Sequence, residues 1–295
     1  MLKIKIGIKR RKRQRSKMIK SYNPTSEGMR TRKTLVSIAT KSKPEKSLIK
    51  ALKGPAGRSN GRISSRHRQR GHKKFYRIID FKRNKMDILA TVSALEYDPN
   101  RGPAIALLNY ADGEKRYILA PEGLKVGDKV MSSKNLLELT PGNCMPLKDM
   151  PLSTQVHNVE INLGAGGQMI RGAGLYGTIM AKEGNYVNIK LPSGEVKKFM
   201  QDSLATAGVL SNFDHRNRVL GKTGIARHLG ARPHIRGVAV ANPTDHPHGG
   251  SYKDKGIGRP SPVSPWGWKT RGKKTRSRKI GLKYLVSPRK STRKV

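Results

Sequence analysis

The 295-residue chain is poor in acidic residues, in cysteine and in long apolar runs. Its one cysteine, Cys144, excludes an intrachain disulfide and a cysteine-based metal cluster. No apolar run approaches the ~18 residues of a membrane-spanning helix, and the N-terminus lacks the apolar core of a signal peptide. Hydrophobic residues make up only 35% of the chain, so we expect part of it to remain outside any core.

The chain has a large excess of positive charge, and this charge is concentrated in two parts of the sequence. Residues 1–85 contain 29 Lys and Arg against 3 Asp and Glu, residues 86–211 contain 12 against 13, and residues 212–295 contain 21 against 3. Two cationic arms therefore flank a nearly neutral centre. Such arms repel themselves unless a polyanion neutralises them, which favours nucleic acid as the partner. An anionic membrane is the rival, but neither arm shows the required amphipathic helix.

The neutral centre has the pattern of short β-strands. Residues 105–110 and 115–119 flank Asp112-Gly113, which is a strong hairpin signal, and further strands are expected over 88–97, 129–131, 156–161 and 186–191. A break at Thr140-Pro141 separates two sets of strands, and close strand spacing is typical of small barrels. The sequence predicts a mainly β protein with barrels over 60–139 and 140–211. Basic extensions cover 1–59, where residues 2–8 could form an edge strand, and 212–295.

The densest cationic stretch, residues 60–85, interleaves arginine with glycine and aromatic residues. Arginine makes bidentate contacts with phosphate, and aromatic rings stack on bases; the alternative is a solvated basic face. The first RNA contacts are expected from Arg62, Arg66, His67, Arg68, Arg70, His72, Lys73, Lys74, Arg77, Lys82 and Arg83. Further contacts are expected from Arg171, Lys222, Arg227, Arg232, Arg236, Arg259, Trp266, Lys273, Lys274 and Arg276.

A glycine-rich segment, residues 164–174, could cradle a nucleotide phosphate. It lacks the Lys-Ser/Thr ending of a P-loop and the strand–helix context of a dinucleotide fold. We therefore favour main-chain amides that approach an RNA backbone, since glycine leaves room for that approach.

Residues 242–250 form the most specialised stretch of the chain, with two prolines, two histidines, one aspartate and two closing glycines. Asp245, His246 and His248 are candidates for a general base or a metal site. No nucleophile motif accompanies them. The alternative is that these residues bind RNA or brace a shaped loop; we assign no catalytic residue, and His246 has at most a supporting role.

From about residue 60 onward the chain resembles the family of universal protein two of the large ribosomal subunit. The resemblance is carried by residues 66–68, 71–73, 96–101, 156–160, 166–168, 218–222 and 236–239, by Tyr76 to Lys85, by Asp112 to Pro121 and by Asp245 to Gly250. It implies an OB-like barrel followed by an SH3-like barrel, both bound to large-subunit rRNA near the peptidyl transferase centre. It also implies roles in subunit assembly, subunit association at an intersubunit bridge and tRNA placement, with ribosomal proteins as neighbours. No cofactor or small-molecule substrate is implied, and Mg²⁺ is expected with the rRNA.

The chain also departs from the family pattern. Gln69-Arg70 replaces part of a glycine run, His228 stands where an aromatic residue is usual, and Ser251-Tyr252-Lys253 follows the 242–250 loop. These departures indicate an organelle ribosome, and residues 258–267 resemble alphaproteobacterial and mitochondrial members more than plastid ones. We therefore expect a mitochondrial ribosome, with a plastid or bacterial cytoplasmic ribosome as the alternative. A free RNA chaperone would explain the arms equally well, but it would not need so specialised a loop.

Overall fold

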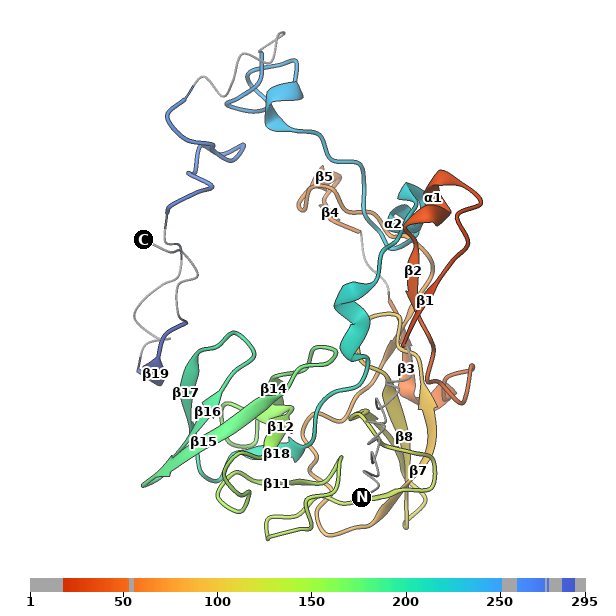
Figure 1. Ribbon diagram of the computed structural model, residues 1–295, viewed down its shortest axis with the longest axis vertical. Helices are drawn as coiled ribbons and strands as arrows, with labels where there is room; N and C mark the ends of the chain where they lie inside the picture. The colour runs from red at the N-terminus through yellow and green to blue at the C-terminus, as the bar shows by residue number, and fades with distance from the viewer. Residues whose placement is uncertain (1–17, 53–55, 251–258, 274, 276–282, 290–295) are drawn as a thin grey trace, which may run out of the picture.

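The computed structural model describes residues 18–52, 56–250, 259–273, 275 and 283–289. The prediction of a mainly β chain, with an OB-like barrel followed by an SH3-like barrel and irregular basic extensions, is confirmed. In Figure 1 the two barrels occupy the lower part of the molecule, and the extensions rise above them. The edge strand considered for residues 2–8 lies outside the described residues.

The first barrel is built on an antiparallel sheet with the strand order β10–β7–β8–β9. Its strands are β7 (Ala90–Glu96), β8 (Ile105–Tyr110), β9 (Lys115–Leu119) and β10 (Lys129–Val130). The predicted hairpin around Asp112-Gly113 is present as β8 and β9. Alternate residues of β8 enter two different apolar clusters, with Ala106 and Leu108 in one and Ile105 and Leu107 in the other. The sheet is therefore buried on both faces.

The second barrel contains a seven-stranded antiparallel sheet in the order β11–β18–β12–β15–β16–β17–β19. The strands are β11 (Cys144–Pro146), β12 (Gln155–His157), β15 (Gly177–Glu183), β16 (Tyr186–Lys190), β17 (Val196–Met200), β18 (Leu204–Ala207) and β19 (Leu285–Ser287). As the alternation predicts, Val187, Ile189 and Leu191 all enter one apolar core.

The expectation of one continuous strand over 156–161 was wrong, because the structure divides this segment between two strands. Asn158 has a φ of 51°, in the left-handed region, which turns the chain out of the seven-stranded sheet. The strand beyond it, β13 (Val159–Glu160), pairs instead with β14 (Gly167–Met169).

Short elements also lie outside the two main sheets, between residues 19 and 77 and between residues 213 and 239. They include β1 (Ile19–Ser21), α1 (Glu27–Arg30), β2 (Lys33–Leu35), η1 (Lys46–Leu48), β3 (Ile49–Ala51), β4 (Arg58–Ser59), β5 (Arg62–Ile63), β6 (Phe75–Arg77), η2 (Phe213–Asn217), α2 (Thr223–His228) and η3 (Gly237–Ala239). The C-terminal extension also returns to the barrels, because β19 pairs with β17 and the Lys198 amide donates to the Tyr284 carbonyl over 2.8 Å. Figure 1 shows β19 beside β17. In the described part of the chain no helix has the length and apolarity needed to cross a bilayer.

A buried histidine makes the stability of the second barrel depend on pH. His157 lies inside the barrel, with Nδ1 2.8 Å from the Gly208 carbonyl oxygen, and burial lowers its pKa to about 4. The unfolded chain binds this proton near pH 6.5, so the folded state loses stability as the pH falls from about 6.5 towards 4.

We predict that wild type loses on the order of 3 kcal/mol more stability than His157→Gln between pH 7 and pH 4. The glutamine amide can still donate to the Gly208 carbonyl, but it does not titrate. Urea unfolding of the RNA-free chain at both pH values measures the difference. An equal loss in the two proteins would contradict the assignment.

Candidate nucleic-acid interface

Two cationic segments that lie far apart in the sequence are joined by backbone hydrogen bonds. The Gln69 amide donates to the Gly230 carbonyl over 2.8 Å, the His72 amide to the His228 carbonyl over 2.9 Å, and the Arg232 amide to the His67 carbonyl over 3.0 Å. We call residues 67–72 and 227–232 the extension junction. Main-chain bonds leave the arginine side chains of both segments free to face outward.

The extension junction shows why glycine is required at position 71 and where the predicted histidines His67 and His72 pack. Gly71 has a φ of 67°, and a Cβ at this position would lie 2.3 Å from the His228 carbonyl oxygen, so only glycine allows this approach. The His72 and His228 rings lie 4.5 Å apart between centroids, and the His67 and His234 rings 4.4 Å apart. His67 and His72 therefore pack on histidine rings of the C-terminal extension.

The hairpin formed by β1 and β2 also contacts the C-terminal extension. The Lys33 amide donates to the Val219 carbonyl over 3.0 Å, and the Val219 amide donates back over 3.1 Å. In Figure 1, α1 and α2 lie side by side above the first barrel. The two arms that the sequence presents as separate thus contact each other directly.

Most of the lysines and arginines predicted to contact RNA have no acidic partner within the protein. Among the described residues, no ion pair to a carboxylate is formed by Arg62, Arg66, Arg68, Arg70, Lys73, Lys74, Lys82, Arg171, Lys222, Arg227, Arg232, Arg259 or Lys273, and all of them are exposed or half-buried. Arg236 is likewise exposed. An external polyanion is the natural partner for such a set.

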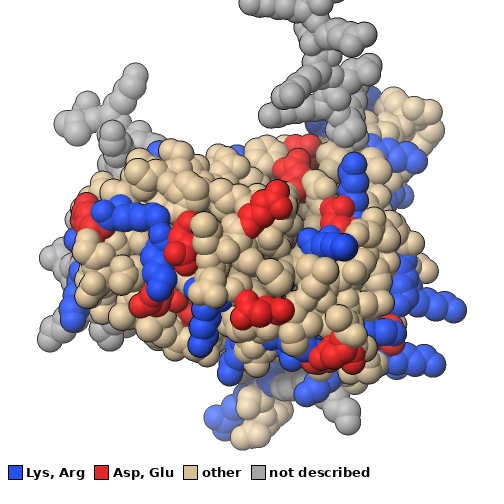
Figure 2. Space-filling view, turned by 90° about the horizontal axis from the view of Figure 1, so that it is seen from below, with Lys and Arg blue, Asp and Glu red and all other residues tan. Residues whose placement is uncertain are grey.

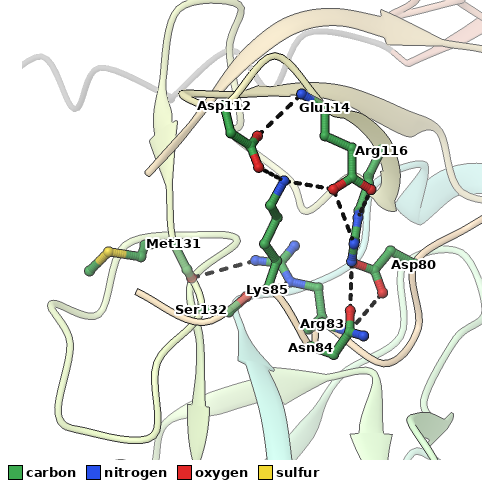
Figure 3. Close-up of polar contacts among 9 residues, drawn as sticks. All are labelled: Asp80, Arg83, Asn84, Lys85, Asp112, Glu114, Arg116, Met131 and Ser132. Atoms are coloured by element: carbon green, nitrogen blue, oxygen red, sulfur yellow. Dashed lines mark hydrogen bonds and ion pairs between the residues drawn. The ribbon is translucent and has the colours of Figure 1, made fainter. Parts of the chain in front are cut away.

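The barrels, by contrast, neutralise much of their own charge. Figure 3 shows Lys85 between the carboxylates of Asp112 and Glu114, and Arg116 between those of Glu114 and Asp80. The guanidinium of Arg116 and the ammonium of Lys85 lower the pKa of the Glu114 carboxyl. On the lower face of the molecule, seen in Figure 2, acidic and basic side chains alternate. Most of the unneutralised cations among the described residues thus lie in residues 62–74 and 222–273, outside the two main sheets.

The structure corrects the prediction that Arg83 contacts RNA. Only 3% of the residue is exposed, and its guanidinium donates to the Ser132 hydroxyl over 2.9 Å and to the Gly142 carbonyl over 3.1 Å. These partners flank the connection between the barrels, so Arg83 fixes that connection from within. Arg77 is also 8% exposed, and its Nη1 donates to the Phe75 carbonyl over 2.9 Å. Neither guanidinium lies on the outer cationic surface, because each donates to the protein itself.

An alternating stack of aromatic rings and guanidinium groups lies near the exposed start of β6. The Arg101 guanidinium lies 4.9 Å from the Tyr76 ring centroid and 5.6 Å from that of Phe81, and the Arg171 guanidinium lies 4.5 Å from Phe81. Asp98 also pairs with Arg101 at 2.5 Å. This arrangement holds the predicted contact Arg171 in place. The sequence analysis did not single out Arg101, because only the fold brings its guanidinium to the Phe81 ring.

Two amides of the glycine-rich segment bind within the protein and are not offered to RNA. The Gly166 amide donates to the Glu160 carboxylate over 2.8 Å, and the Gly167 amide donates to the Phe81 carbonyl over 2.8 Å. These two amides are therefore occupied within the protein, and the segment connects the two barrels.

The 242–250 loop is braced by its own histidines. The ring nitrogen Nδ1 of His246 accepts from the His248 amide over 3.1 Å, and Nε2 of His248 accepts from the Val263 amide over 2.8 Å. His246 packs so closely on Gly237 that a Cβ there would meet its ring at 2.4 Å. Burial, His248 and Arg66 lower the pKa of His246, so its ring stays a neutral acceptor. Asp245 is exposed. The described residues contain no group of three or more His, Cys, Asp or Glu that could hold a metal ion.

The remaining predicted residues lie beyond this loop. Trp266 is 73% exposed, and the Lys273 ammonium lies 3.8 Å from the centroid of the Trp268 ring. Lys274 and Arg276 lie outside the described residues.

The fold and this surface define a class, namely a two-barrel protein with a fixed cationic surface suited to RNA. Two family models match the chain: the RNA binding N-terminal domain of Ribosomal Proteins L2 over residues 45–132, and the C-terminal domain of Ribosomal Proteins L2 over residues 140–267. The chain belongs to this family. It is a structural ribosomal protein with an RNA-binding domain, as the resemblance implied.

The structure predicts different roles for two neighbouring cations, the exposed Lys82 and the buried Arg83. Arg83→Met removes charge-assisted hydrogen bonds from buried acceptors, so we expect a loss of about 2–4 kcal/mol in the free energy of unfolding. The exposed neighbour Lys82→Met should change stability by less than about 0.5 kcal/mol and weaken RNA binding instead. Denaturant unfolding and RNA titration of both variants separate the two roles. A stable Arg83→Met variant with weakened RNA binding would reverse our assignment.

Proposed function

We propose that this protein binds large-subunit rRNA close to the peptidyl transferase centre and supports subunit assembly, subunit association and tRNA placement. The observation that carries the proposal is the extension junction, which holds unpaired cations at fixed positions on one surface. A rigid cationic surface can match one RNA fold, whereas free arms would bind any polyanion.

The 242–250 loop supports the same function over that of a free RNA chaperone. Its histidines use their ring nitrogens to accept backbone hydrogen bonds, which fixes the loop's shape. Non-specific binding depends on charge alone and needs no such shape. Magnesium enters this proposal as part of the rRNA fold, and the protein's partners are rRNA and neighbouring ribosomal proteins, with the small subunit at a bridge.

We further propose a mitochondrial ribosome as the location. The support is the resemblance of residues 258–267 to alphaproteobacterial and mitochondrial members, together with the departures at Gln69-Arg70 and after Gly250. Crosslinking of the tagged chain in cell extract, followed by sequencing of the attached RNA, tests both points. Recovery of one mitochondrial large-subunit rRNA at a few central sites is expected. Diffuse recovery from many RNAs would contradict the ribosomal proposal.

Phosphate contacts should give the RNA affinity a steep salt dependence. Replacing Arg66, Arg68 and Arg70 together by alanine should lower the slope of log K against log salt by about 2–3, roughly one for each lost phosphate contact. Filter binding to rRNA fragments between low and moderate salt measures the slope. The matched control replaces Lys125, Lys129 and Lys134 of the first barrel and should leave the slope nearly unchanged.

His246 should act through the shape of its loop. His246→Ala removes the ring that packs on Gly237 and accepts from the His248 amide, so we expect fewer assembled subunits or weaker tRNA binding. Subunits that do assemble should form peptide bonds at the wild-type rate. Gradient sedimentation and single-turnover peptide-bond formation measure the two effects, with the exposed Thr244→Ala as control. Fully assembled variant subunits that have lost only the chemical step would contradict this role.

A further inference from the structure

The C-terminal extension leaves the second barrel and later returns to it. It leaves after β18, at the fully buried Leu210, and it returns at β19, which pairs antiparallel with β17. Four strands, β12, β15, β16 and β17, separate β18 from β19 in the order of the sheet. We call residues 212–284 the return loop, because this stretch is covalently continuous and both of its ends are attached to one sheet.

The two limbs of the return loop do not pack on each other. Among the described residues of the loop, His248 alone is buried. Within the part of the chain that the structure describes, no hydrogen bond or ion pair joins residues 212–235 to residues 259–289. Figure 1 shows the limb that contains α2 and the limb that ends at β19 on opposite sides of the view. The loop is therefore closed along the chain but is not filled by its own described residues.

The charge of the return loop calls for a polyanion between its limbs. Residues 212–295 contain 21 Lys and Arg against 3 Asp and Glu, so the two limbs repel each other. The returning limb also carries two exposed indole rings, with Trp266 73% exposed and Trp268 59% exposed. Flat rings stack on bases, and lysine and arginine side chains bind phosphates. Charge and rings together favour RNA over an acidic protein segment.

Few contacts hold the end of the loop in place. β19 has three residues, and the contacts beside it are the Lys198 amide, which donates to the Tyr284 carbonyl over 2.8 Å, and the Tyr186 and Tyr284 rings, 6.4 Å apart between centroids. Val286 is 47% exposed, and no residue of β19 belongs to the apolar core of the second barrel. A short edge strand of this kind opens more easily than the strands of a core. The loop can therefore open at β19 while the barrel stays folded.

We propose that a segment of the bound rRNA passes through the return loop, and that β19 pairs with β17 after this segment has entered. A long folded RNA cannot pass end-first through a closed loop, so β19 must open to admit it. Once β19 has paired, the path of the chain holds the RNA in addition to the charges. This inference rests on the proposed function, because the RNA must first bind the cationic surface.

A reversible disulfide between β17 and β19 tests the proposal in the full chain. Val196 and Ser287 are cross-strand partners, so Val196→Cys with Ser287→Cys places two thiols within reach of a disulfide. The native Cys144 is buried and does not compete. The probe is a large-subunit rRNA transcript, folded in Mg²⁺, with a stable hairpin at each end. The variant binds this RNA in low salt, is oxidised and is then moved to high salt, which weakens the phosphate contacts.

We expect the oxidised complex to stay bound in high salt and to dissociate when the disulfide is reduced. The control is the same variant oxidised before it meets the RNA, which should not form a salt-resistant complex because its loop is already closed. Salt resistance in this control would show that the disulfide only stiffens the surface, and it would overturn the proposal. Ser287→Cys alone, which cannot close the loop, should dissociate in high salt.

A second pair, Lys197→Cys with Leu285→Cys, serves if the first pair does not oxidise, since these residues are also cross-strand partners. Equal release of the oxidised and reduced complexes in high salt would show that the RNA lies outside the loop. In that case only the loop proposal fails, because binding in low salt is intact. If neither the wild-type chain nor the reduced variant binds the transcript in low salt, the rRNA-binding function fails as well.

Discussion

The structure depends on holding many positive charges in fixed positions without acidic partners. The chain has 62 Lys and Arg against 19 Asp and Glu, and three of those acids, Asp80, Asp112 and Glu114, already pair with Lys85 and Arg116 of the first barrel. Repulsion among the remaining cations opposes a compact fold. Backbone hydrogen bonds do not depend on side-chain charge, so the extension junction can hold cationic segments together while their side chains point toward a polyanion.

The barrels contribute rigidity rather than charge. Their sheets are buried on apolar cores, and Arg83 and the glycine-rich segment fix the connection between them. The cationic extensions start from this base and return to it, since β19 pairs with β17 at the far end of the chain. The RNA-binding surface is therefore attached to the core at several points, which favours a preformed surface over one that folds only on binding.

The sequence alone determined the β class, the Asp112-Gly113 hairpin, the segregation of charge and the family, because turn chemistry, alternation and composition are local properties. Only the tertiary structure decided which cations face outward. Arg83 and Lys82 are neighbours in the sequence, yet one is buried at the barrel connection and the other is exposed. Arg101 reaches Phe81, and residues 67–72 reach residues 227–232, through contacts between distant segments that no local pattern encodes.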